Sequence, residues 1–537
     1  MSKIEPEVLD KLNQQLRRGK ELFQQEKYDQ ALEIFERLAS IATKDANVFR
    51  LQGITLFQLH RYDEAIEVLQ RSHALDPENA VQAYYIGSSY YQKGMYEEAV
   101  NWFGRAVELK EDYAAAWINL GVNWRKLKET EKALFCVERA LTIDDSLANA
   151  HNNRANYLRF LGKRREAVES YKRAVELSPN DQSTLVNIGD VFQELGEYDL
   201  AKEYFEKVLQ QDPSHPKANT FLSFVYLIRG QLEMGWPYYI HRWGMVEGGE
   251  PKASMKRQEW QGEELQGKTL FVYHEQGYGD TIQFIRYLKV LRERGVERLI
   301  FRSQEAVLDL VKTTGWADVW LSGDDRVPEH DYQVALMELP RLLNTGVKTI
   351  PGGVPYLHPV AEKRAQWAPM VQAPEGKLKV GMVWAGSTTH ANDHNRSVGL
   401  EAMSQLLMVE NTAWFSLQKG DPANALTAYA SRFTNLGPDL ESFHDTAAAL
   451  LSLDLLITVD TSVAHLAAAL GKPVWIMLPF SPDWRWMLQR ADSPWYPSAR
   501  LFRQSEPGRW DDLLQTMQII LEQVAAGRVP LEDFSVS

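Results

Sequence analysis

Residues 460–473, DTSVAHLAAALGKP, carry side chains suited to binding an anion. The apolar run LDLLITV (453–459) precedes them and predicts a buried strand. After this strand, Asp460, Thr461 or Ser462 is expected to cap a helix. The exposed amides and the positive dipole end of a helix N-terminus bind phosphate or diphosphate groups, and hydroxyl groups in the first turn add donors. The segment therefore predicts an anion site.

The rest of this segment predicts which side chains share a helix face and where the helix ends. His465 follows Thr461 by four residues, so both lie on one helix face, from which the imidazole could reach a phosphate or a ribose. Gly471 is expected to end the helix in a left-handed conformation, and Pro473 prevents its continuation. A well-capped structural helix with a hydrogen-bonded histidine would show the same pattern, so the segment alone supports both interpretations.

Neighbouring predicted strands also end in polar residues. Gly386 and Arg396 follow one strand, and Gln418 and Lys419 follow the next, where Lys419 is suited to pair with a phosphate. Downstream, PFSPDWRWM contains Trp484, Arg485 and Trp486, which are suited to stacking on a base or a sugar, although tryptophans in such a run also fit a core. We expect these strand ends to converge on one pocket.

A second polar loop, HEQGYGD (274–280), follows the short apolar run TLFVY (269–273). An amphipathic segment and the run RLIFR come next, so the order is strand, loop, helix, strand. Asp280 is a candidate general base for deprotonating a hydroxyl group, or else the cap of the following helix. Glu275 and His274 crowd the same loop, and either could be the base instead.

These loops must be positioned by two α/β lobes. We predict a linker at 243–267, a first lobe at 268–370 and a second lobe at 371–537 that ends in an amphipathic helix. The predicted strands are TLFVY, RLIFR, ADVWL and YQVAL in the first lobe, and KVGMVWAG, TAWFSLQ, LDLLITV and PVWIML in the second. Adjacent lobes of this kind place ligand sites at the carboxyl ends of their strands, facing one cleft.

Residues 1–242 contain a repeat of 34 residues, about seven times over. Small residues recur at this period in two columns: Gly19, Gly53, Gly87, Gly121, Ala155, Gly189 and Ser223, and Ala31, Ala65, Ala99, Ala133, Ala167, Ala201 and Gly235. Four residues after each member of the second column stands a large apolar residue, such as Phe35 or Leu69. The small residues allow two helices to approach closely, and the large residue fills the space between them. The pattern predicts stacked helix pairs with a concave groove.

Asn119, Asn153 and Asn187 stand two residues before the small position of three successive repeats. A side-chain amide can donate to and accept from a peptide backbone, so such a column could hold an extended acceptor chain with little regard to its sequence. The column resembles the asparagine ladder of protein O-GlcNAc transferases. Asparagine is also tolerated on any solvated helix face, which is the alternative.

The repeats resemble the tetratricopeptide repeat (TPR) family. Residues 268 to about 527 resemble the GT-B glycosyltransferases related to bacterial heptosyltransferases (family 9-like), on the motifs GYGD and DTSVAHLAAALGKP. The combination is similar to TPR-containing protein O-glycosyltransferases such as flagellin glycosyltransferases. This resemblance implies an α-solenoid, a TPR superhelix, followed by an α/β GT-B fold of two Rossmann-like lobes.

The resemblance also implies roles for the candidate residues. Thr461, Ser462 and His465 would bind the donor diphosphate, and Asp280 would be the general base of an inverting transfer. GT-B enzymes neutralise the leaving group with protein cations, so no metal and no cofactor is expected, and the nucleotide-sugar is a substrate. No His/Cys cluster with ligand spacing appears in the sequence.

We expect a cytoplasmic glycosyltransferase that moves a sugar from a nucleotide-sugar to Ser or Thr of an acceptor protein held by the TPR groove. Flagellin that receives a nonulosonic acid from a CMP donor is one case that the resemblance suggests. One alternative is a TPR scaffold with a catalytically silent transferase domain. Another is a lipopolysaccharide-type sugar transferase whose repeats only dock partners.

Composition narrows the classes of partner. The formal charge is −13 over 537 residues, which argues against a nucleic-acid partner. No apolar stretch is long enough to span a bilayer, and the first residues do not predict a secretory signal, so we expect a soluble protein. The single cysteine, Cys136, lies between apolar residues, fits a reducing cytosol and is expected to be a buried structural thiol.

Overall fold

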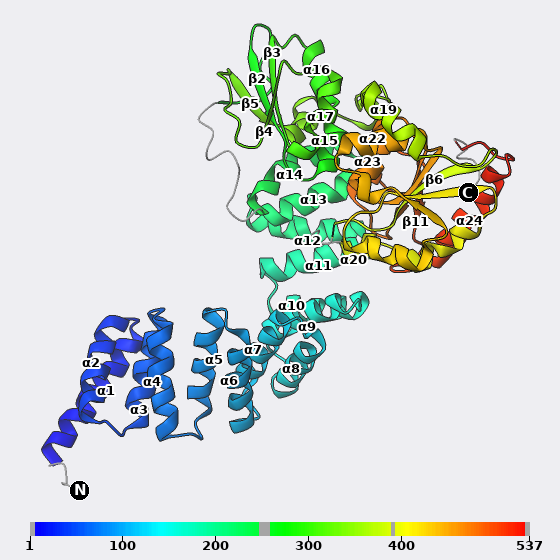
Figure 1. Cartoon of the computed structure of the whole chain (residues 1–537). Helices are drawn as coiled ribbons and strands as arrows, with labels where there is room; N and C mark the ends of the chain where they lie inside the picture. Colours follow the sequence, from blue (N-terminus) through cyan, green and yellow to red (C-terminus); the bar gives the residue numbers. More distant parts are fainter. Residues whose placement is uncertain (1–5, 246–257, 388–392, 532–537) are drawn as a thin grey trace. The chain divides into compact units, whose positions relative to one another are not determined.

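The computed structural model describes residues 6–245, 258–387 and 393–531 (Figure 1). The chain forms two compact units that divide between Val191 and Phe192. The first unit is helical, and the second contains helices and two parallel β-sheets.

The first unit consists of antiparallel helix pairs. Its helices are α1 (Pro6–Gln24), α2 (Tyr28–Ile41), α3 (Ala46–Gln58), α4 (Tyr62–Leu75), α5 (Ala80–Gln92), α6 (Tyr96–Leu109), α7 (Ala114–Lys126), α8 (Thr130–Ile143), α9 (Ala148–Phe160) and α10 (Arg164–Leu177), followed by α11 (Gln182–Glu194), within which the unit boundary falls. The second helices of the first three pairs begin at Tyr28, Tyr62 and Tyr96, which keeps the predicted period. The predicted helical solenoid is therefore confirmed.

The two columns of small residues act as the sequence predicted. A Cβ atom at Gly53 would lie 2.5 Å from Cγ of Leu69, so only glycine permits this approach of the two helices. Ala65 and Leu69 are fully buried between the helices, and burial of a leucine contributes about 1.5–3 kcal/mol. Cys136 is also buried, and burial raises the pKa of its thiol to about 12, so it is a structural residue.

The second unit begins with the last helices of the repeat pattern. These are α12 (Tyr198–Gln211), α13 (Pro216–Ile228), α14 (Leu232–Tyr239) and the 3₁₀ helix η1 (Ile240–Met245). Trp236 on α14 is buried, and its indole Nε1 donates to the carbonyl of Thr345 at 2.8 Å. The structure thus groups these helices with the α/β part of the chain, whereas the sequence pattern groups them with the repeats.

The first lobe contains a parallel sheet of order β1-β5-β2-β3-β4. Its strands are β1 (Gln258–Glu259), β2 (Thr269–Tyr273), β3 (Arg298–Ser303), β4 (Val319–Ser322) and β5 (Tyr332–Ala335), and its helices are α15 (Tyr278–Phe284), α16 (Tyr287–Glu293), α17 (Glu305–Val311) and α18 (Leu339–Leu342). All four predicted strands are present.

The predicted linker at 243–267 contains a short strand. Its residues 246–257 lie outside the described part of the chain. Beyond them β1 pairs with β5, and the nearby Trp260 is buried. The sequence did not predict this edge strand, because the strand contains only two residues and both are polar.

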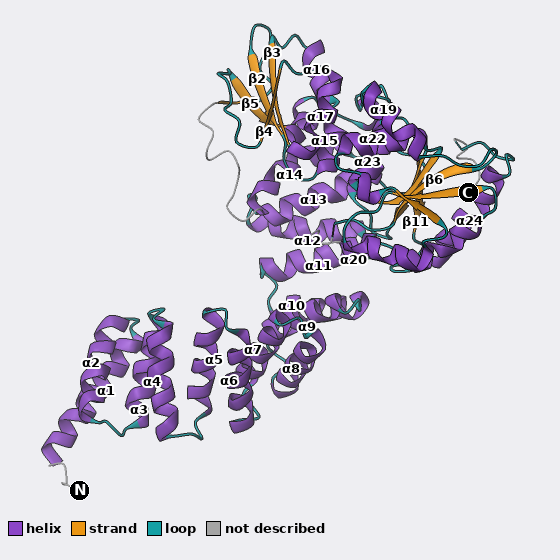
Figure 2. Cartoon of the chain, viewed as in Figure 1, coloured by secondary structure: helices purple, strands orange, loops and turns teal. Residues whose placement is uncertain are grey.

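The second lobe contains a parallel sheet of order β11-β10-β9-β6-β7-β8. Its strands are β6 (Leu378–Val383), β7 (Thr412–Ser416), β8 (Phe433–Asn435), β9 (Leu455–Val459), β10 (Val474–Leu478) and β11 (Ala499–Arg503). The helices are α19 (Ala361–Trp367), α20 (Asp393–Arg396), α21 (Leu400–Met403), α22 (Phe443–Ser452), α23 (Ser462–Ala469) and α24 (Asp511–Ala525). Figure 2 shows the two sheets apart from each other, with α15, α17, α22 and α23 between them.

The second sheet forms the central layer of its lobe. Strand β9 is buried along its whole length, as expected for a central parallel strand with covered faces. A core of apolar side chains joins the sheet to α24, which supplies Leu514 and Leu521. Parallel strands connected by helices fit the predicted α/β class. No helix of the described residues is both long enough and apolar enough to cross a membrane.

Candidate functional site

A cavity of about 1070 Å³ lies in the second unit, between the two lobes. Its lining comes from segments that follow the carboxyl ends of β2, β3, β6, β7, β8, β9 and β10, the edge at which parallel α/β sheets bind ligands. The predicted site residues that line it are Asp280 from the first lobe and Gly386, Arg396, Gln418, Lys419, Asp460, Thr461, Ser462 and His465 from the second. The structure thus brings these two predicted sets together in one place.

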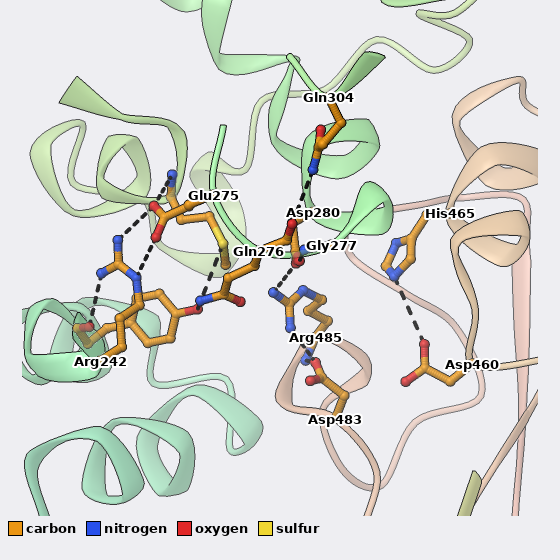
Figure 3. A network of polar contacts seen from close by, with 12 residues as sticks. Arg242, Glu275, Gln276, Gly277, Asp280, Gln304, Asp460, His465, Asp483 and Arg485 are labelled. Atoms are coloured by element: carbon orange, nitrogen blue, oxygen red, sulfur yellow. Dashed lines mark hydrogen bonds and ion pairs between the residues drawn. The ribbon is translucent and has the colours of Figure 1, made fainter. Parts of the chain in front are cut away.

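Asp280 stands at the start of α15 and makes two contacts. Its Oδ2 accepts a hydrogen bond from the amide of Gly277 at 2.9 Å, so the carboxylate caps the helix. Its Oδ1 forms an ion pair with Arg485 of the second lobe (Figure 3). Burial raises the pKa of Asp280, and the charge of Arg485 opposes this rise. Asp280 therefore caps α15 and lines the cavity at the same time.

Gly279 explains the need for glycine in the GYGD loop. A Cβ atom at this position would lie 2.9 Å from Cδ2 of His465. A side chain would thus push the start of α15 away from α23. Glycine allows the two helices to touch, and this contact brings the Asp280 loop next to the loop that starts α23.

The helix predicted after the strand LDLLITV is present as α23, which begins at Ser462. Thr461 is the N-cap residue with extended backbone, and its side chain makes no capping bond among the described residues. Its hydroxyl lies 3.2 Å from that of Thr458. Gly471 follows the helix with φ of +71°, as the sequence predicted.

His465 is both buried and part of the cavity wall. Its Nδ1 lies 3.0 Å from the hydroxyl of Tyr496, and its ring stacks on Trp486 with centroids 5.0 Å apart. Burial, reinforced by the positive charge of Arg485, lowers the pKa of His465 to about 3. The imidazole is therefore neutral at pH 7, and it can contribute a hydrogen bond to a ligand but no charge.

Asp483 is a site residue that the sequence did not predict, whereas Arg485, which the sequence suggested for stacking, forms ion pairs with Asp280 and Asp483. Nη1 of Arg485 donates to Oδ1 of Asp483 at 2.8 Å, while Nη2 pairs with Asp280. Although burial disfavours its charge, the two carboxylates hold the pKa of Arg485 above its ordinary value. Asp460 also lines the cavity, and burial together with the charge of Asp483 raises its pKa to about 6. The signal for Arg485 was its place in an aromatic run after a strand, but nothing in the sequence pairs it with Asp280.

The remaining predicted residues of the second lobe make hydrogen bonds or close contacts with its loops. Oε1 of Gln418 accepts from the amides of Trp384 and Ala385 at 3.0 Å each, which fixes the loop after β6. Lys419 donates to the carbonyl of Leu440. Nε of Arg396 bonds Asp393 at 3.2 Å, and a Cβ atom at Gly386 would lie 2.5 Å from Nη2 of Arg396. Lys419, Arg396 and Arg485 thus bring positive charge to the cavity wall.

Three of the predicted catalytic and donor-site residues do not line this cavity. Trp484 is buried against Trp236, with ring centroids 5.4 Å apart, so it packs in a core and does not face the ligand space. Nδ1 of His274 lies 3.2 Å from the carbonyl of Arg302, and burial lowers the pKa of this histidine. Glu275 is buried in an ion pair with Arg242.

The three predicted asparagines lie in the first unit, each half-buried on the first helix of its pair. Nδ2 of Asn119 donates to the hydroxyl of Tyr84 at 3.0 Å. Nδ2 of Asn187 donates to Oδ1 of Asn152 at 3.3 Å. The repeat pattern does not predict these neighbours, because Tyr84 and Asn152 lie outside the asparagine column. Asn119, Asn153 and Asn187 occupy equivalent places on α7, α9 and α11.

The described residues contain no group of three or more His, Cys, Asp or Glu side chains arranged to hold a metal ion. The expectation that the reaction uses no metal concerns the chemistry, and it stays a prediction.

Comparisons with known proteins identify the repeats. Models of the tetratricopeptide repeat match residues 22–85, 87–126 and 146–214. The 34-residue repeats are tetratricopeptide repeats. Protein FlbA of Caulobacter vibrioides is 24% identical over 326 residues, which cover 56% of this chain and 54% of FlbA. The chain thus spans about half the length of this curated relative.

Three solved structures similar to this chain cover between 30% and 39% of it. MamA is 24% identical over 30% of this chain and 94% of its own, with a TM-score of 0.29. YrrB, described as a TPR protein with an unusual peptide-binding site, is 22% identical over 34% and 95%, with a TM-score of 0.31. PilF of Pseudomonas aeruginosa is 18% identical over 39% and 96%, with a TM-score of 0.36.

Proposed function

We propose that this protein is a glycosyltransferase of the GT-B type that moves a sugar from a nucleotide-sugar to a Ser or Thr hydroxyl of an acceptor protein held by its TPR groove. The observation that carries the proposal is the shared cavity, which both the Asp280 carboxylate and the start of α23 line. A carboxylate in the same cavity as the amides of a helix start and the cations Lys419 and Arg396 suits a transfer from a phosphate leaving group.

The second lobe would bind the donor. The first amides of α23 and the hydroxyls of Thr461 and Ser462 can donate to a diphosphate or phosphate. Lys419 and Arg396 line the same cavity and can neutralise the charge that develops on the leaving group. The neutral His465 beside them can make a hydrogen bond to the donor.

Asp280 would be the general base of an inverting transfer. It takes the proton of the acceptor hydroxyl while the hydroxyl oxygen forms a bond to the anomeric carbon of the sugar. The bond from this carbon to the phosphate oxygen breaks, and the electron pair leaves with the nucleotide. Burial of Asp280 raises its pKa and so makes it a stronger base, and the ion pair with Arg485 limits this effect.

A specific observation also favours the scaffold alternative. Both oxygens of Asp280 already have partners, the amide of Gly277 and the side chain of Arg485. If these contacts persist with a ligand bound, the second unit would bind a nucleotide without transfer, and the repeats would assemble partners. Donor binding does not separate the two functions, whereas turnover does.

A nucleotide screen tests the donor site. One of the UDP-, ADP-, GDP- or CMP-sugars is expected to raise the melting temperature, because a ligand at 100 times its Kd stabilises the folded state by about 2.7 kcal/mol. Lys419→Met should weaken this donor about tenfold or more, since hydrogen bonds to charged groups contribute about 1.5–3 kcal/mol. Lys472→Met is the matched control, because Lys472 also contacts a backbone carbonyl, that of Leu451, but does not line the cavity. Absence of stabilisation by every nucleotide-sugar would contradict the proposal.

The acceptor groove is tested by changing Asn119, Asn153 and Asn187 together to Ala. Acceptor affinity is expected to fall about tenfold or more, since each hydrogen bond contributes about 0.5–1.5 kcal/mol. Hydrolysis of the donor should not change, and the control is Asn101→Ala on α6, where the side chain is exposed. Affinity is measured by titration of a labelled acceptor. Equal affinity of the triple variant and the wild type would remove the case for an asparagine ladder. Flagellin, with a nonulosonic acid from a CMP donor, is the acceptor that the resemblance suggests.

A further inference from the structure

Arg242 lies at the centre of a buried ion-pair network in the second unit. It belongs to η1, directly after the last repeat helix α14. Its Nε and Nη2 donate to the two carboxylate oxygens of Glu275 at 2.9 and 2.7 Å. Its Nη1 donates to Glu338 at 2.5 Å and to the carbonyl of Tyr239 at 3.0 Å. All three charged side chains are about 95% or more buried.

Glu275 is the first residue of the loop that ends in Asp280. Besides its two bonds to Arg242, its Oε1 accepts from the amide of Met337 at 3.1 Å. The next residue, Gln276, has φ of +58°, and its Nε2 lies 3.5 Å from the hydroxyl of Tyr239. Figure 3 shows this side of the network next to the Asp280 and Arg485 pair.

The loop 275–280 is thus held at both ends by arginines from outside the first lobe. Arg242 holds the carboxylate at the start of the loop, and Arg485 holds the carboxylate at its end. Gln304 adds one bond in the middle, from its Nε2 to the carbonyl of Gln276 at 3.1 Å. Only the first of these anchors comes from the helical repeats.

We propose that Arg242 is a positioning residue for the loop 275–280, and that the end of the TPR array is therefore a structural part of the transfer site. This inference rests on the proposed function for its activity readout, but its structural readout does not. Without Arg242, the Glu275 and Glu338 carboxylates would be buried and unpaired, a costly state that they relieve by turning toward water. Because Glu275 is part of the loop, this movement would displace the loop and hence Asp280.

A network that only stabilises the fold would behave differently. Its loss would lower the melting temperature without a local change in the loop of the folded protein. The distinguishing measurements are therefore hydrogen–deuterium exchange of residues 275–280 in the native state, and the separate effects on kcat and on donor affinity. Donor affinity depends on α23 and Lys419, which Arg242 does not contact in the described structure.

The experiment compares the full-length wild type with Arg242→Met. We expect exchange in 275–280 to accelerate tenfold or more, while exchange in β3 stays unchanged. We expect kcat to fall tenfold or more while the Kd of the nucleotide changes less than threefold, and Arg242→Lys should recover part of kcat. The control is Arg341→Gln, because Arg341 bonds Glu338 at 3.0 Å from outside the loop.

Arg242→Met combined with Glu275→Gln and Glu338→Gln covers the case in which the single variant does not fold. It buries no unpaired charge, yet it lacks the ionic anchor, so its loop should also exchange faster than that of the wild type. Wild-type exchange in 275–280 of either folded variant would overturn the proposal, as would an equal loss of kcat in Arg341→Gln. If the wild type transfers no sugar, the proposed function fails, and the exchange result still decides the role of Arg242.

Discussion

Asp280→Asn is expected to lower the rate of sugar transfer by about 10²–10⁴-fold, because general-base catalysis contributes rate factors of this size. Asparagine keeps the shape of the side chain but cannot take the proton of the acceptor hydroxyl. Donor affinity should stay within a few-fold of the wild type, since the first amides of α23 and Lys419 are unchanged. The measurement is single-turnover transfer at saturating donor, together with a separate donor titration.

Asp483→Asn is the matched control for this variant. Asp483 shares the guanidinium of Arg485 with Asp280, so both variants remove one carboxylate from the same arginine. If the base is Asp280, Asp483→Asn loses much less activity. Retained turnover in Asp280→Asn would contradict the assignment. The next candidate for the base would then be Asp460, which lines the cavity and has a pKa raised to about 6.

The same assignment predicts how transfer depends on pH. Burial raises the pKa of Asp280, so the base becomes protonated at a higher pH than an exposed aspartate would. Transfer by the wild type should therefore rise with pH through this raised pKa and fall below it. The residual activity of Asp280→Asn should lack this dependence.

Arg485→Met is expected to lower the free energy of unfolding of the second unit by about 3–5 kcal/mol, since removing one partner of a buried ion pair leaves unpaired charge. Arg485 is buried and pairs with carboxylates from both lobes. The control is Arg490→Met, whose partner Asp492 is exposed, and for which a loss of about 1 kcal/mol or less is expected. Urea unfolding of both variants measures the difference.

The loss in Arg485→Met should depend on pH in a defined direction. Without the guanidinium, the pKa of the buried Asp280 in the folded protein rises further above its unfolded value. A group with a raised folded-state pKa stabilises the fold when protonated, and this contribution disappears as pH rises through the folded-state pKa. The deficit relative to wild type should therefore be smaller at pH 5 than at pH 8. A deficit that does not change with pH, or one no larger than that of Arg490→Met, would mean that Arg485 does not hold the charge of Asp280.

The sequence predicted the elements whose signals are local. The 34-residue period gave the helix pairs, and short apolar runs gave β2 and β9 close to their observed bounds. It did not predict β8 or β11, because these strands mix polar and apolar residues and lie among loops. The end of α23 at Gly471 was predictable, because a left-handed residue after a helix is usually glycine.

The candidate site was predictable where chemistry follows directly after a strand, as for Asp280, Lys419 and Thr461. It was not predictable where the role depends on a distant partner. Glu275 stands in the same loop as Asp280 and looks equally suited to be a base in the sequence. Only the fold shows that its charge is neutralised by Arg242, which lies in the least regular part of the repeats. Trp484 was ambiguous for the same reason, because its neighbour Trp236 comes from α14.

The central claim is that a nucleotide-sugar binds in the cavity that the Asp280 loop and the start of α23 both line. A crystal structure with the nucleotide-sugar that stabilises the protein tests this claim most directly. The account predicts phosphate oxygens within hydrogen-bond distance of the Thr461 and Ser462 amides, and the anomeric carbon on the side facing Asp280. A nucleotide bound outside this cavity, or a sugar that points away from Asp280, would contradict it.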